Sequence, residues 1–134
     1  MDKKELCQLA RQARQQAYCP YSNYKVGAAV LGENGKVYLG CNIENASYGL
    51  TVCAERCAIF KMVSDGCLHF TALAVASSGT KDGAPCLACR QVMTEFTKDF
   101  QVPVYHFGGD DSIFEHTMEE ICPLPFVSFV PGID

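Results

Sequence analysis

Apolar residues recur at three- and four-residue spacing in three parts of the chain, and this spacing predicts helices. The first helix covers about residues 3–17 and ends before "CPYS". A second is expected after Thr51, a good N-cap residue, and should end at Asp65-Gly66. Pro85 favours the first position of a third helix.

Runs rich in β-branched and aromatic residues predict the strands. Strands near 24–31 and 36–41 flank "GENG", where the Asn34-Gly35 pair should supply the positive φ angles of a tight hairpin. The uninterrupted apolar run 71–77 is typical of a strand covered on both faces. In a further strand, 101–107, Pro103 favours an edge position or a bulge. The order α-β-β-α-β-α-β plus a tail predicts an α/β fold, with residues 1–134 forming one domain.

Charge and composition narrow the classes of partner. The formal net charge of -4 and the pI near 5.3 argue against nucleic-acid binding, which needs a basic surface. No apolar run is long enough to span a membrane, and "MDKKELCQLARQ" lacks the apolar core of a secretory signal. We therefore expect a cytoplasmic protein with no membrane partner. Nine cysteines, an odd count, favour reduced thiols over a disulfide scaffold.

Cysteines stand at two of the predicted helix starts, in "CAER" at 53–56 and "PCLAC" at 85–89. The first of these segments also holds an acid and a base, Glu55 and Arg56. Helix N-termini favour thiolates, and three sulfur ligands leave open the fourth position that a catalytic Zn²⁺ keeps for water. Glu55 is placed to move protons from that water. Arg56 could donate to the sulfurs and offset their charge. The spacing resembles the signature of zinc-dependent deaminases, with Cys as the first ligand in place of His.

Other interpretations of the cysteines remain open. Cys53, Cys86 and Cys89 could be core residues, "CLAC" alone could be a redox pair, and Cys57 could close a structural zinc module as a fourth ligand. The remaining cysteines are interpreted as small core residues: Cys7, Cys19, Cys41, Cys57, Cys67 and Cys122. The histidines are interpreted as surface or strand residues: His69, His106 and His116.

Longer segments carry a family resemblance. "CNIENASYGLTVCAER" and "PCLACRQVM" closely resemble the small homotetrameric cytidine deaminases, and the likeness extends through "PYSNYKVGAAV" to "EEICPLPF". It implies a three-layer α/β/α fold with a mixed sheet of about five strands, in which the two zinc helices pack side by side on one face.

The resemblance also implies roles for individual residues. Cys53, Cys86 and Cys89 would bind Zn²⁺, and Glu55 would be the proton shuttle. The expected nucleoside contacts are the ribose-binding pair Asn42 and Glu44, the ring of Tyr24 at a position that is often Phe, the main chain at Ala54 and Ala84, and Phe126 from a neighbouring subunit. Leu87 stands at a usual Gly position and could crowd the pocket, while Cys122 replaces a common Leu and should only fill space.

The expected activity is hydrolysis of cytidine and deoxycytidine to uridine, deoxyuridine and ammonia. A deaminase of the blasticidin S type shares the zinc motif and is the enzymatic alternative, and a structural zinc module is the non-enzymatic one. The apolar tail "PFVSFVPGID" (125–134) favours an oligomer interface, with packing on the chain's own core as the other possibility.

Overall fold

A computed structural model describes residues 1–81 and 83–127 of the chain. Its centre is a sheet of five strands in the order β2-β1-β3-β4-β5. β3 and β4 are parallel, and the other neighbouring strands are antiparallel, so the sheet is mixed as expected. The strands are β1 (Gly27–Gly32), β2 (Val37–Cys41), β3 (Phe70–Ala76), β4 (Pro103–Phe107) and β5 (Ile113–Thr117).

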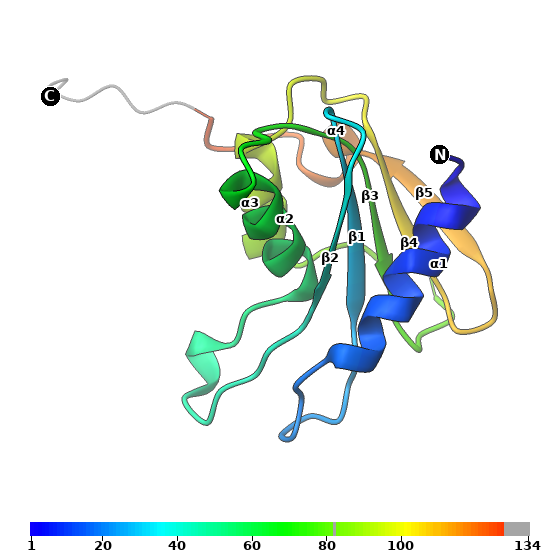
Figure 1. Cartoon of the computed structure of the whole chain (residues 1–134), viewed down its shortest axis with the longest axis vertical. Coiled ribbons are helices and arrows are strands. Elements are labelled where there is room, and N and C mark those ends of the chain that lie inside the picture. The colour runs from blue at the N-terminus through cyan, green and yellow to red at the C-terminus, as the bar shows by residue number, and fades with distance from the viewer. Residues whose placement is uncertain (82, 128–134) are drawn as a thin grey trace, which may run out of the picture.

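Helices cover both faces of this sheet (Figure 1). Alternate residues of β1 point to opposite sides, so Ala29 packs with α1 while Ala28 and Val30 pack with α2. The α/β/α layering predicted from the sequence is thereby confirmed. The helices are α1 (Lys3–Ala13), α2 (Ala54–Ser64), α3 (Leu87–Glu95) and α4 (Met118–Ile121), with 3₁₀ turns at Arg14–Gln16 and Tyr48–Leu50.

The two helices with the polar motifs begin later than predicted. Cys53, and not Thr51, is the N-cap of α2, and Cys86 is the N-cap of α3, so Pro85 precedes the cap instead of opening the helix. The end of α2 is as predicted, with Asp65 at the C-cap. The shift matters because it puts one cysteine of each motif at a helix N-terminus, where unpaired N–H groups favour a thiolate.

The β1–β2 hairpin is confirmed, but its turn differs in detail. Gly35 has φ +83°, whereas Asn34 is not among the residues with positive φ. The N–H of Gly35 donates to the carbonyl of Gly32 over 2.9 Å, and the side chain of Asn34 accepts from the N–H of Lys36. A single left-handed residue therefore completes the turn.

The edge position expected for the Pro103 strand is wrong, since β4 lies between β3 and β5. Pro103 is the first residue of β4 and pairs with Thr117 of β5, while the β3–β4 pairing starts one residue later at Val104. The first position of a strand is one that proline tolerates inside a sheet. The edge strands are β2 and β5, and β5 was not predicted.

None of the helices in the described residues is long and apolar enough to cross a membrane.

Candidate active site

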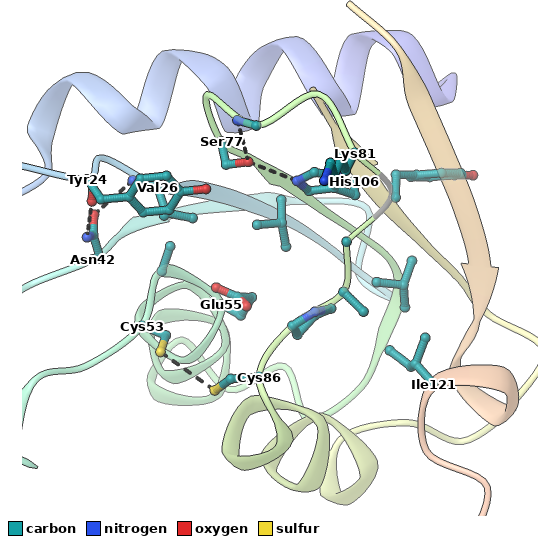
Figure 2. Close-up of a pocket in the computed structure, with 18 of the residues that line it drawn as sticks. Tyr24, Val26, Asn42, Cys53, Glu55, Ser77, Lys81, Cys86, His106 and Ile121 are labelled. Carbon is teal, nitrogen blue, oxygen red and sulfur yellow. Dashed lines mark hydrogen bonds between the residues drawn. The ribbon is translucent and has the colours of Figure 1, made fainter. Parts of the chain in front are cut away.

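A cavity of about 740 Å³ opens where the N-termini of α2 and α3 face the sheet (Figure 2). It is lined by residues that are far apart in the sequence, from the loop before β1 to α4. Most of the predicted site residues meet there: Tyr24, Asn42, Glu44, Cys53, Ala54, Glu55, Ala84 and Cys86.

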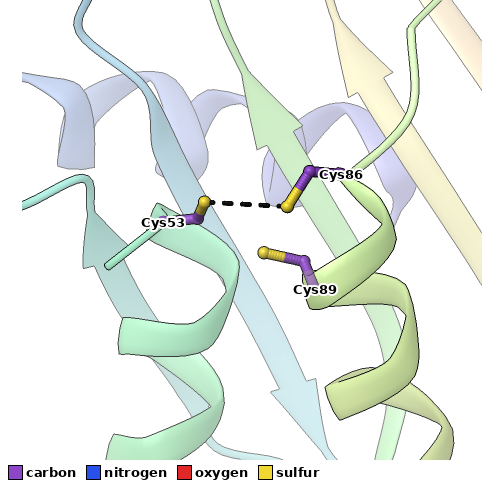
Figure 3. Close-up of side chains that lie close together, drawn as sticks. All are labelled: Cys53, Cys86 and Cys89. Carbon is purple, nitrogen blue, oxygen red and sulfur yellow. Dashed lines mark hydrogen bonds between the residues drawn. The ribbon is translucent and has the colours of Figure 1, made fainter. Parts of the chain in front are cut away.

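Three thiols form a compact cluster beside this cavity (Figure 3). The sulfur atoms of Cys53, Cys86 and Cys89 all lie within 4.8 Å of one another, and 3.8 Å separates those of Cys53 and Cys86. Cys89 is buried, one turn into α3, while the two N-cap cysteines are partly accessible. Cys57 does not belong to this group, which among the described residues has three members.

The thiols depend on one another electrostatically. The hydrogen bond from Cys89 lowers the pKa of Cys53, and hydrogen bonds from Arg56 and Cys86 lower it further. The same Cys53 hydrogen bond, together with burial, raises the pKa of Cys89. These opposite shifts favour the thiolate at Cys53 over that at Cys89. Three soft sulfur donors at this separation fit Zn²⁺.

Arg56 supplies positive charge to the cluster. Its Nη2 atom donates to Sγ of Cys53 over 3.4 Å, and this bond raises the pKa of the guanidinium. The Nε atom of Arg56 is buried without a hydrogen-bond partner among the described residues. The guanidinium thus keeps a further donor next to a set of groups that become anionic when a metal binds.

Glu55 projects from the first turn of α2 into the cavity (Figure 2). Its side chain is buried, with 5% of the residue exposed, and burial raises the pKa of its carboxyl to about 7, helped by the charge of Cys53. A carboxyl with a pKa near neutrality can accept and return a proton at the same pH.

At another part of the cavity wall, the side chain of Asn42 is hydrogen-bonded to the segment before β1. Its Nδ2 donates to the carbonyl of Tyr24 over 2.7 Å, and its Oδ1 accepts from the N–H of Val26 over 2.9 Å. One N–H and one lone pair of the Asn42 amide remain for a ligand. Asn42 thus also positions Tyr24, a role that the sequence did not suggest.

Glu44 is held by the same segment. Its Oε1 accepts from the N–H groups of Tyr21 and Ser22, and its Oε2 accepts from the Ser22 hydroxyl over 2.5 Å. The Ser22 hydroxyl is the main cause of the lowered pKa of Glu44. The carboxylate is therefore ionised at neutral pH, and it accepts hydrogen bonds on the cavity wall.

Several polar residues line the cavity that the sequence had not singled out: Ser22, Tyr48, Ser77, Lys81, His106 and His116. The two histidines lie in β4 and β5, as the strand interpretation expected, but they also face the cavity. The alternation of β4, in which Val104 and His106 share a face, was the available signal.

Phe126 lies outside the cavity lining among the described residues and is 67% exposed. Its main chain is fixed to α3, because Gln91 donates to its carbonyl over 2.6 Å and accepts from its N–H over 3.1 Å. Neither Phe126 nor Val127, 63% exposed, packs on the chain's own core, and the rest of the tail, 128–134, lies outside the described residues. Leu87 is 76% exposed and does not line the cavity, so the crowding expected from it is wrong.

The sequence and the fold are both similar to those of known proteins. Residues 1–105 match a family described as "Cytidine and deoxycytidylate deaminase zinc-binding region". A cytidine deaminase of Sporosarcina psychrophila is 48% identical over 94% of this chain and 92% of its own length. The crystal structure of cytidine deaminase from Burkholderia pseudomallei has a TM-score of 0.89 at 42% identity, covering 94% of this chain and 100% of that one.

A crystal structure of cytidine deaminase from Mycobacterium tuberculosis has a TM-score of 0.79 at 35% identity, covering 94% of this chain and 98% of that one. The cluster of three thiols, the mixed five-stranded sheet and these relatives all indicate the same family. The chain belongs to the cytidine and deoxycytidylate deaminase zinc-binding family.

Proposed function

We propose that the chain is a zinc-dependent cytidine deaminase of pyrimidine nucleoside salvage, which converts cytidine and deoxycytidine to uridine and deoxyuridine with release of ammonia. Residues 1–134 act as one catalytic domain. The observation that carries the proposal is the buried carboxyl of Glu55 in a cavity beside three clustered thiols.

Cys53, Cys86 and Cys89 are the residues that would hold Zn²⁺. When bound, the metal lowers the pKa of water and so makes a nucleophile available near neutral pH. Three protein ligands leave a position free for that water, whereas a structural zinc site needs four. Since the cluster has three members among the described residues, its composition favours the catalytic type.

Glu55 moves the protons of the reaction. As the oxygen of water adds to C4 of the cytosine ring, Glu55 takes a proton and delivers it to N3. It then takes the remaining proton of the hydroxyl added at C4 and passes it to the exocyclic amine, so that the C4–O double bond forms as the C4–N bond breaks and ammonia leaves. A carboxyl whose pKa is about 7 serves in both directions without a large energy penalty.

The wall residues bind the nucleoside. Asn42, with one N–H and one lone pair to spare, and Glu44, an ionised carboxylate on the cavity wall, take the ribose hydroxyls. The half-exposed ring of Tyr24 packs against the nucleoside, and the main chain at Ala54 and Ala84 contacts the edge of the base.

A neighbouring copy of the chain completes the site in a homotetramer. Phe126 has an anchored main chain and an exposed ring, as expected of a side chain that reaches another subunit. Its ring would cover the pyrimidine of that neighbour.

The negative net charge of the chain favours a small nucleoside over a polynucleotide as the substrate. The proposed place of the reaction is the cytoplasm.

Ammonia release from four compounds tests the proposal: cytidine, deoxycytidine, blasticidin S and a cytosine-containing oligonucleotide. We expect turnover of both nucleosides and none of the oligonucleotide. Turnover of blasticidin S alone would assign the chain to the alternative deaminase type. No turnover of any compound by zinc-loaded protein would favour the structural module.

A further inference from the structure

The cavity contains a hydrogen-bonded pair that the proposed reaction does not use. Ser77 directly follows β3, His106 lies in β4, and Oγ of Ser77 is 2.9 Å from Nε2 of His106. The N–H of Gly79 also donates to the Ser77 hydroxyl in a longer contact of 3.4 Å. Both side chains line the cavity, on the side away from Cys53 and Cys86 in Figure 2.

The cavity lining holds apolar as well as polar residues, and the apolar residue Val75 adjoins this pair. Val75 pairs with His106 across β3 and β4, and Val75, Val104 and Ile121 line the cavity with 7%, 4% and 7% of their surfaces exposed. Ser77 is itself buried, with 5% exposed. A ligand that covers these residues removes water from the polar pair, which is unfavourable unless the ligand offers a hydrogen-bonding group in return.

Unsubstituted cytidine offers no such group on one of its ring edges. With the ribose at Asn42 and Glu44 and N3 turned to Glu55, the opposite edge of the ring carries only C–H groups at C5 and C6. In that orientation this edge would turn away from α2, and Figure 2 shows Ser77 and His106 on the side of the cavity away from the α2 cysteine Cys53.

We propose that Ser77 and His106 form a subsite for a small hydroxylated substituent at C5 of the cytosine ring, so that a 5-hydroxymethyl nucleoside is preferred over one with an apolar C5 group of similar size. This inference rests on the proposed function and narrows its substrate class. The chemistry is unchanged, since water still adds at C4, the C4–N bond breaks, ammonia leaves and the substituent remains on the ring.

The hydrogen-bonding capacity of the pair suits a hydroxyl in either histidine tautomer. If Nε2 of His106 donates to Ser77, the hydroxyl hydrogen of Ser77 is left to donate to the ligand. If Ser77 donates to Nε2, its oxygen keeps a lone pair to accept from the ligand. A hydroxymethyl group can match both arrangements because it is donor and acceptor at once, whereas an ethyl group of similar size can match neither.

The test compares kcat/KM for 5-hydroxymethylcytidine and 5-ethylcytidine, with cytidine as the reference, in the zinc-loaded protein. One neutral hydrogen bond gives a ratio of about 3 to 10 in favour of the hydroxymethyl compound. The ratio should fall to about one in Ser77→Ala and in His106→Leu, while His106→Gln, whose amide can still pair with Ser77, should keep part of it.

A matched control is Thr97→Val, which removes another buried hydroxyl, bonded to the carbonyl of Met93 and outside the cavity lining. It should leave the ratio unchanged. A ratio near one in the unaltered protein, or the same ratio in Ser77→Ala and His106→Leu as in the unaltered protein, would overturn the subsite. Because cytidine is measured alongside, loss of all deamination would instead count against the proposed function.

Discussion

The guanidinium of Arg56 donates to the sulfur of Cys53 over 3.4 Å within the first turn of α2, while the neighbouring Glu55 side chain points into the cavity. Consecutive residues thus serve two separate purposes. In the proposed reaction, Arg56 would offset the charge of the thiolates, and Glu55 would face the substrate. A helix that only packs on the sheet would not need either group, and their placement supports the proposed reaction centre at this helix start.

Replacing Arg56 with Gln should weaken zinc retention and lower kcat by about 10- to 100-fold, because the thiolates lose their nearest positive charge. Competition with a chelator and steady-state kinetics measure the two effects. Lys4→Gln, which removes an exposed positive charge on α1, should change neither. Equal zinc retention in Arg56→Gln and Lys4→Gln would contradict this role.

Glu44 should make stability depend on pH. Its folded-state pKa lies below the ordinary value of 4.5, mainly because of the Ser22 hydroxyl. The carboxylate therefore stabilises the fold above about pH 4.5, and the contribution is lost as the pH falls through the lower folded-state value. Thermal unfolding of chelator-treated Glu44→Gln should show its largest deficit near pH 7 and a shrinking deficit below pH 4.5. A deficit that grows toward acid would contradict the assignment.

Gly40 should control the position of α2. A Cβ at Gly40 would meet main-chain atoms of α2, the Ala54 carbonyl oxygen at 2.5 Å and the Ala58 nitrogen at 2.5 Å. Gly40→Ala must push the helix off β2, and we expect a loss of about 1 to 3 kcal/mol with weaker zinc binding. At Gly49 an added Cβ meets nothing within 4 Å, so Gly49→Ala is the matched control. Equal melting temperatures for the two variants would show that the contact relaxes freely.

Much of the fold could be predicted from periodicity and turn chemistry. The hairpin at Gly35, strand β3, which is buried except at Thr71, and the end of α2 at Asp65 all have strong local signals. β5 and α4 were missed because their signals are weak. The strand has no buried residue, and the helix is only four residues long. The capping box between Thr117 and Glu120 was the one readable sign of α4.

The site, too, has parts that could be predicted from the sequence and parts that could not. The spacing of Cys53, Cys86 and Cys89 predicted a cluster that the structure contains, because that spacing resembles a known deaminase signature, although Cys53 is 33 residues from Cys86. The Ser77–His106 pair joins two strands far apart in the sequence, and no local pattern reports such a contact. The hydrogen bonds of Asn42 to the Tyr24 segment depend equally on tertiary structure.

Phe126 should act across a subunit boundary. We expect Phe126→Ala to raise KM by about 10-fold, since a buried aromatic contact with the base is lost. Co-expression of Phe126→Ala with Glu55→Gln should restore part of the activity, because mixed oligomers contain sites with Glu55 from one chain and Phe126 from the other. Light scattering reports the oligomeric state. A lasting monomer, or no recovery in mixed oligomers, would contradict the arrangement.

The proposed deamination requires Glu55 to move protons beside a metal held by three cysteines. Zinc content and cytidine turnover should be measured together on purified Glu55→Gln. We predict as much zinc per chain as in the unaltered protein, with kcat lower by about 10²- to 10⁴-fold. Ordinary turnover by the zinc-loaded variant would contradict the account.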